Sequence, residues 1–185
     1  MYNVALLILI IFCLDDTQAQ NASYRDLLHL LNTTSRIYVY YTSYMMYKNN
    51  DALTCLYYLK DVLTETFFRV DLNYNRYDER FSREVTGILG NDTKGDPFMQ
   101  PFSWPGPWPP MPKVLKYYDS RHHCGVFLLQ VAGTMQCELH IWEGDIIKKE
   151  QYFYNIKKTC ITFYNKICGG EKPTVTMYTT NCYKI

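Results

Sequence analysis

Residues 137–142, with the sequence CELHIW, form a short segment whose two faces differ in chemistry. Side chains in a β-strand point alternately to opposite faces. One face therefore carries sulfur and aliphatic groups, from Cys137, Leu139 and Ile141, and the other carries a carboxylate, an imidazole and an indole, from Glu138, His140 and Trp142. Residues 124–131 also begin at a cysteine and are predicted to form a neighbouring strand. A sheet with one covered face and one polar-aromatic face favours a closed barrel that holds a small ligand.

Residues 1–19 are predicted to be a secretory signal peptide. Residues 4–14 form an apolar run of eleven residues, too short to span a bilayer. The small residues Thr17 and Ala19 precede the expected cleavage site, although no Lys or Arg precedes the run and two acids lie beside the cut. We expect residues 20–185 to form one secreted domain with no membrane-spanning segment.

The charge of the mature chain excludes some partners. The signal holds two acids and no Lys or Arg, so the mature net charge is 19 − (18 − 2) = +3. This value is too small to favour nucleic acid or an anionic membrane. Sequons at Asn21, Asn32 and Asn91 predict glycosylation, in agreement with secretion.

Six cysteines remain after the signal peptide is removed: Cys55, Cys124, Cys137, Cys160, Cys168 and Cys182. An even number of cysteines in a secreted chain predicts disulfides, with fifteen possible pairings. Zinc binding is the alternative, but no Cys-x-x-Cys pair is present. The adjacent His122 and His123 would point to opposite faces of an extended chain. We therefore expect no metal and no other cofactor.

Hydrophobic periodicity predicts a helix near each end of the domain and strands between them. Ser23 can cap a helix over residues 24–31, and the spacing of apolar residues predicts a second helix over 156–167, ending at Gly169. Strands are predicted at 36–48, 54–58, 64–72, 81–89, 114–118, 124–131 and 136–142, with turns at 49–51, 73–78 and 90–95 and an extended piece at 174–178. This order favours an antiparallel barrel or sandwich.

Residues 97–112 contain seven prolines together with four large aromatic residues, Phe98, Phe102, Trp104 and Trp108. Proline cannot donate a ladder hydrogen bond, so this segment is predicted not to be a central strand. It is interpreted as a stiff aromatic loop over a pocket mouth, as a polyproline segment that binds a partner, or as a surface loop whose rings pack on the rim.

The chain resembles the tick salivary lipocalins, the family that includes the histamine-binding proteins. The resemblance covers essentially the whole mature chain. It rests on the N-terminal helix followed by Val39-Tyr40-Tyr41 and Tyr47-Lys48-Asn49, on Cys55, on Tyr118-Asp119-Ser120 before Cys124, on Glu138-Leu139, and on Cys160 and Cys182. It implies an all-β fold, an eight-stranded antiparallel lipocalin barrel with an N-terminal helix, a C-terminal helix packed outside and a ligand inside.

The resemblance also implies the disulfides Cys55–Cys182 and Cys124–Cys160, which leaves Cys137 to pair with Cys168. Strand alternation supports this set. Cys124 and Cys137 lie on the face opposite the predicted lining, where an outside helix would pack.

Amine binders of this family neutralise ammonium groups with acidic side chains, because an unpaired buried charge is costly. The resemblance keeps one of these acids, Glu138. Gly125 stands at a second acidic position. A third position falls near Asn50, beside Asp51, and a fourth falls near Arg83. A buried arginine would oppose an ammonium ion and favour a carboxylate.

The predicted ligand-binding set comprises Tyr40, Tyr47, Asn50, Asp51, Arg83, Glu138, His140 and Trp142. His140 stands at an aromatic position of the family pattern, and Trp142 follows on the same face. The alternative is that Arg83 faces solvent, that Glu138 and His140 form a satisfied buried pair, and that the tyrosines simply pack.

The resemblance implies a secreted salivary protein, expected to be a monomer, that sequesters a small host mediator. Histamine or serotonin is the first expectation, and a leukotriene or fatty acid is the alternative. A third possibility is an inhibitor that binds a host protein of complement or haemostasis. No nucleophile elbow, metal motif or catalytic triad is found in the sequence, so we expect no enzyme activity.

Overall fold

The computed structural model describes residues 21–48, 51–77, 79–105, 109–147, 157–169 and 174–183. The predicted signal peptide lies outside the described residues, as do Asn50, Trp108 and the start of the predicted second helix. None of the helices in the described ranges is long and apolar enough to cross a membrane.

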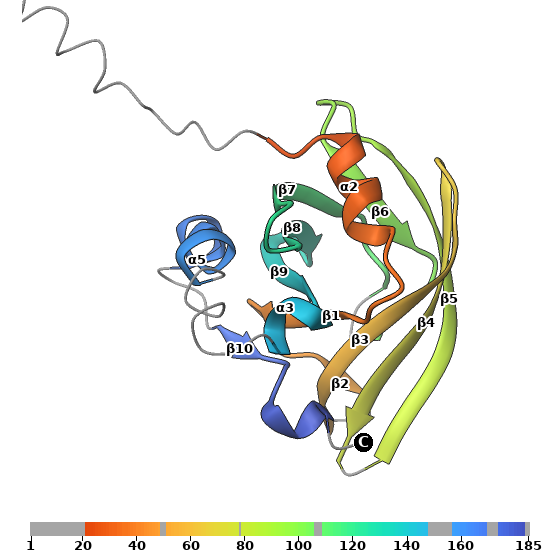
Figure 1. The fold of residues 1–185 in the computed structure, drawn as a ribbon, viewed down its shortest axis with the longest axis vertical. Coiled ribbons are helices and arrows are strands. Elements are labelled where there is room, and N and C mark those ends of the chain that lie inside the picture. Colours follow the sequence, from red (N-terminus) through yellow and green to blue (C-terminus); the bar gives the residue numbers. More distant parts are fainter. Residues whose placement is uncertain are drawn as a thin grey trace, which may run out of the picture.

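Eight antiparallel strands of the described chain close into a barrel (Figure 1). They are β1 (Ile37–Thr42), β3 (Asp51–Leu63), β4 (Phe67–Arg76), β5 (Glu79–Asn91), β6 (Pro97–Pro101), β7 (Lys113–Asp119), β8 (Cys124–Val131) and β9 (Thr134–Trp142). The sheet closes because β1 pairs with both β9 and β3. Two short strands, β2 (Tyr47–Lys48) and β10 (Val175–Thr176), extend its edges. The predicted eight-stranded antiparallel barrel is confirmed.

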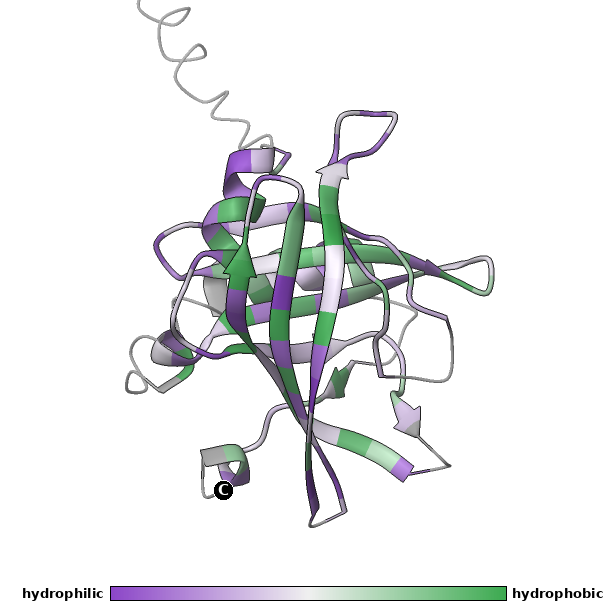
Figure 2. Ribbon diagram, turned by 90° about the vertical axis from the view of Figure 1, so that its right-hand side faces the viewer, coloured by the Kyte–Doolittle hydropathy of each residue, from purple (hydrophilic) through white to green (hydrophobic). Residues whose placement is uncertain are grey.

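Alternation along the strands separates an inner core from an outer one. Figure 2 shows hydrophobic and hydrophilic bands following one another along single strands. The inner cluster includes Phe68, Leu72, Leu115 and Phe127, all buried, from three different strands. The outer cluster is a second set of buried residues on the other face of the sheet: Tyr38, Tyr40, Tyr57, Val126, Leu139, Ile141, Tyr164, Tyr178 and the six disulfide cysteines, with Ile161.

The helices cover an end and a side of the barrel (Figure 1). Helix α2 (Tyr24–Leu31) lies near one end, and its first turn has a capping box in which Ser23 and Asp26 exchange hydrogen bonds. At the other end of the chain, the π-helical turn η1 (Lys157–Ile161) leads into α5 (Thr162–Cys168), which lies outside β8 and β9. Two elements were not predicted: α3 (Glu143–Ile147) directly after β9, and the 3-10 turn η2 (Thr180–Tyr183).

Three disulfides fasten the C-terminal part of the chain to the barrel. They are Cys55–Cys182 and Cys124–Cys160, the two pairs that the family resemblance implies, and Cys137–Cys168, the pair that was left. The last two join β8 and β9 to the helical segment that η1 and α5 form. The first ties the tail to β3. The sulfur face of β9 is thus the face that the outside helix covers.

The expectation that residues 97–112 contain no central strand was wrong. Strand β6 occupies the first five of these residues and has β5 on one side and β7 on the other. Its two prolines, Pro97 and Pro101, are its first and last residues, so the missing N–H groups fall at the strand ends, where proline is tolerated. The pairing of β6 with β7 is correspondingly short.

The turn predicted at residues 73–78 was also misplaced. β4 continues through Arg76, and Asn73, Tyr74 and Asn75 stand opposite residues of β5 in unbroken register. The turn begins at Tyr77, which has a positive φ of 53°. The asparagines were interpreted as turn residues, but cross-strand pairing in a long hairpin outweighs their local preference.

Candidate functional site

Glu138 lies at the centre of a buried polar cluster inside the barrel. Its Oε2 accepts a hydrogen bond from Lys113 Nζ at 2.6 Å and contacts His140 Nε2 at 2.8 Å. Its Oε1 accepts a hydrogen bond from the hydroxyl of Tyr44. The side chains of Glu138 and His140 are fully buried, and that of Lys113 is 1% exposed. The cluster joins β7 and β9 with the segment that follows β1.

His140 connects this cluster to β3, which lies two strands away around the barrel. Its Nδ1 lies 2.9 Å from the hydroxyl of Tyr58 on β3, and its ring packs against Phe127. A neutral His140 with its proton on Nε2 satisfies both contacts, because Nε2 then donates to Glu138 and Nδ1 accepts from Tyr58. The predicted inward orientation of Glu138 and His140 agrees with these contacts.

Burial and ion pairing shift the pKa values of the cluster residues in opposite directions. Burial would raise the pKa of Glu138, but Lys113 and His140 hold it at about 2. Burial lowers the pKa of Lys113 to about 8, although Glu138 opposes the change. Burial also lowers the pKa of His140 from its ordinary value. At neutral pH the cluster therefore holds a carboxylate, an ammonium group and a neutral imidazole.

Acid should destabilise the protein through Glu138. The folded pKa of about 2 lies below the ordinary 4.5, so this carboxylate contributes stability that is fully present above pH 4.5 and is lost as the pH falls toward 2. Urea unfolding measured from neutral pH downward should show this loss. The variant Glu138→Gln should lose less stability across the same window. Equal pH dependence in the two proteins would contradict the assignment.

Four residues in contact with this cluster were missing from the predicted site: Lys113, Trp104, Tyr44 and Tyr58. Lys113 Nζ lies 3.6 Å from the centroid of the Trp104 ring, and that ring packs edge-on against Tyr58. The sequence held a weak signal for Lys113, because it stands two residues before the buried Leu115 on the same strand face. Trp104 belongs to the inner cluster. Its position favours the interpretation of the proline-rich segment as an aromatic loop over the barrel interior.

Arg83 is the second notable cation of the interior. It stands two residues before the buried Val85, on the same face of β5, and opposite Leu72, so this half-buried residue faces inward, contrary to the solvent-facing alternative. Its Nε and Nη2 are buried and have no hydrogen-bond partner among the described residues. The indole Nε1 of Trp104 is in the same state. Buried donors without acceptors are unusual and require an explanation.

The other predicted site residues do not join this cluster. Tyr40 lies in the outer cluster, where its ring stacks on Tyr178 with centroids 5.5 Å apart, so the expectation that it lines the interior does not hold. It points outward because Val39, its neighbour on β1, points inward. Tyr47 is 39% exposed on β2. Asp51 pairs instead with Arg76, at 3.7 Å.

Trp142 lies farther along β9, under helix α2. Its Nε1 donates to the backbone oxygen of Leu30, and its ring stacks on His123 with centroids 3.9 Å apart. It therefore helps to fix α2 over the end of the barrel. The sequon residues Asn21, Asn32 and Asn91 are exposed, and their glycosylation stays a prediction.

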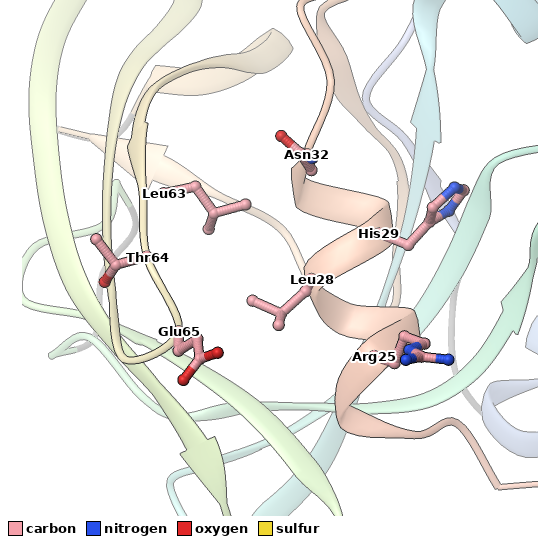
Figure 3. Close-up of a pocket in the computed structure, with 7 residues that line it drawn as sticks. All are labelled: Arg25, Leu28, His29, Asn32, Leu63, Thr64 and Glu65. Atoms are coloured by element: carbon pink, nitrogen blue, oxygen red, sulfur yellow. The ribbon is translucent and has the colours of Figure 1, made fainter.

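An open groove and a small cavity adjoin residues named above. The larger is an open groove of about 430 Å³ between α2 and the β3–β4 hairpin, lined by Arg25, Leu28, His29, Asn32, Leu63, Thr64 and Glu65. Figure 3 shows Leu28 and Leu63 pointing toward one another across it. A second cavity of about 20 Å³ adjoins Lys113, Trp104 and Tyr44. Within the described ranges, no group of three or more His, Cys, Asp or Glu side chains could hold a metal ion.

A closed eight-stranded antiparallel barrel with an external helix after its last long strand is the fold type of the lipocalins. The solved structure of AM182 in complex with serotonin matches with a TM-score of 0.57 and 14% identity, over 84% of this chain and 91% of that one. Japanin from Rhipicephalus appendiculatus, bound to cholesterol, gives a TM-score of 0.49 and 12% identity, over 80% and 95%. No protein-family model and no curated protein matches the sequence. At these identities the likeness is one of fold alone.

Proposed function

We propose that this chain is a secreted lipocalin that sequesters a small host mediator inside its barrel. Three features support the proposal: the closed barrel, the charged groups in its interior, and the resemblance of the sequence to the tick salivary lipocalins. The three disulfides suit an oxidising, extracellular environment. Such a protein needs affinity for its ligand and no chemical step.

The interior charges favour a ligand with an acidic group. The family resemblance leads first to histamine or serotonin, whose ammonium groups would pair with Glu138. In this chain Lys113 already neutralises Glu138. Arg83 is another cation on the inward face, and its Nε and Nη2 lack acceptors among the described residues, whereas Arg76 on β4 pairs with Asp51. We therefore favour a lipid carboxylate, such as a leukotriene or a fatty acid, with its acid group at Arg83.

The unpartnered donors of Arg83 carry this assignment. Tyr58, Leu72 and Arg83 stand in one row across β3, β4 and β5, and Trp104 packs on Tyr58. The indole Nε1 of Trp104, the other buried donor without an acceptor, therefore lies in the same part of the interior. A carboxylate has two oxygens that can accept from a guanidinium group, which makes it the matching chemistry.

The experiment compares a long-chain fatty acid with the alcohol of the same chain length, on protein stripped of co-purified lipid. The fatty acid should bind more tightly than the alcohol. The variant Arg83→Gln should weaken binding of the acid about 10- to 100-fold, because a charge-assisted hydrogen bond is lost, and should leave the alcohol unaffected. Arg80→Gln is the matched control, since Arg80 lies on the same strand but contacts the outward-facing Tyr57. Calorimetry measures all of these affinities.

The other outcomes of this titration also decide between functions. Tight binding of histamine or serotonin, with no binding of the acids, would restore the amine assignment. Loss of acid binding in Arg80→Gln equal to that in Arg83→Gln would show a general charge effect. If none of these ligands binds, binding to a host protein becomes the favoured function.

A further inference from the structure

The buried cluster contains an ammonium-binding site that the chain itself fills. Lys113 Nζ is paired with Glu138 Oε2 at 2.6 Å and lies 3.6 Å from the centroid of the Trp104 ring. A carboxylate together with an aromatic face is how proteins recognise ammonium groups. Tyr44 donates a hydrogen bond to the second oxygen of Glu138, which fixes the carboxylate in place. Glu138, Trp104 and Tyr44 all come from elements other than β7, which carries Lys113.

Stability alone does not account for this ion pair. Taking both charges out of water is expensive, and well-packed apolar residues in place of a buried pair are often equally stable or more so. Glu138 and Lys113 are both almost fully buried, so their pairing carries the whole of this desolvation cost. A role in selecting ligands would explain why a buried ion pair is present here in place of apolar side chains.

We infer that Glu138, Trp104 and Tyr44 form a site for a primary ammonium ion, and that Lys113 excludes amine ligands from this barrel by occupying that site. The inference rests on the proposed function, because selection matters only if the barrel binds small molecules. Lys113 is then a specificity-determining residue. Shortening it should turn the interior into a receptor for alkylammonium ions.

The test truncates Lys113 to alanine and adds a small ammonium ion that has the same atoms as the removed part of the side chain. In the variant Lys113→Ala, n-propylammonium replaces the side chain beyond Cβ, next to the cavity that Lys113 and Trp104 line. Saturating n-propylammonium should raise the Tm of the disulfide-complete variant by about 5 °C. The wild-type protein should show no such rise. The neutral isostere n-propanol should have no effect on either protein.

A second variant provides the matched control. Lys113→Ala combined with Glu138→Gln keeps the cavity but removes the carboxylate, so n-propylammonium should no longer raise its Tm. A rise equal to that of the single variant would overturn the inference, as would an equal response to n-propanol or no response in the folded single variant.

If Lys113→Ala does not fold by itself, the yield of refolding answers the same question. Refolding with n-propylammonium should then give several-fold more soluble, disulfide-complete protein than refolding with n-propanol. Equal yields would refute the ammonium site. Neither version of the test uses a fatty acid or an Arg83 variant, so its failure leaves the carboxylate proposal standing. Failure of the fatty-acid titration likewise leaves this result interpretable.

Discussion

Replacing Glu138 with alanine should lower the free energy of unfolding by about 3–5 kcal/mol at pH 7. The change would leave the ammonium group of Lys113 buried without its counter-charge, and it would remove the acceptor for His140 and Tyr44. Urea unfolding with the disulfides intact measures the loss. A loss below about 1 kcal/mol would show that the cluster is not coupled as its distances indicate.

The pH dependence of this variant provides a second check. Without Glu138, the pKa of Lys113 should fall further below its present value of about 8. The unfolded chain would then bind more protons than the folded one, so the stability of the variant should rise with pH. The gap between wild type and variant should therefore be larger at pH 5 than at pH 9. A constant gap would contradict the role assigned to Lys113.

A double variant separates the effect of breaking the ion pair on stability from the effect of removing side-chain volume. Glu138→Gln combined with Lys113→Met removes both charges and keeps side chains of similar size. It should recover most of the stability that Glu138→Ala loses, because no unpaired charge remains. Poor recovery would mean that the hydrogen bonds of His140 and Tyr44, and not the ion pair, dominate the energy of the cluster.

Removing the Cys55–Cys182 disulfide should cost about 2–5 kcal/mol. The bridge joins β3 to the C-terminal tail across 127 residues, the longest separation among the three. Closing a longer loop restricts the unfolded chain more strongly in the loop-entropy account. The variant is Cys55→Ser with Cys182→Ser, and urea unfolding compares it with the wild type.

The Cys137–Cys168 bridge is the matched comparison, with a separation of 31 residues. Its replacement by two serines should cost about 1 kcal/mol less than that of the longer bridge, if loop entropy dominates. All four cysteines are buried, so the new hydroxyl groups have similar surroundings. A larger loss for the shorter bridge would show that packing of α5 on β9 matters more than loop length.

Much of the fold was predictable from local patterns. The bounds of α2 and β8 follow from a capping serine, a leucine face and an alternating strand that begins at Cys124. The errors arose where pairing partners override local preference. β6 tolerates two prolines because they lie at its ends, and β4 runs past two asparagines because β5 stands opposite them.

The site was only half predictable, for a related reason. Alternation along β9 places Glu138 and His140 on one face, and no knowledge of the rest of the chain is needed for that step. The partner of Glu138 lies 25 residues earlier, on a strand that is not adjacent to β9 in the sheet. The local sequence around Lys113 indicates only that its side chain shares a face with Leu115, and it does not identify Lys113 as that partner.

The sequence by itself determined which side chains share a face of each strand, because alternation depends only on backbone geometry. It also predicted that six of the seven cysteines, all but Cys13 of the predicted signal peptide, would pair. The tertiary structure decided which charges meet. Closing the barrel brings Lys113, Glu138 and Trp104 into one buried volume, and it leaves the half-buried Arg83, on the inward face of β5, without a partner among the described residues. The strength of each interaction depends on distance and on the exclusion of water, and only the closed barrel sets both.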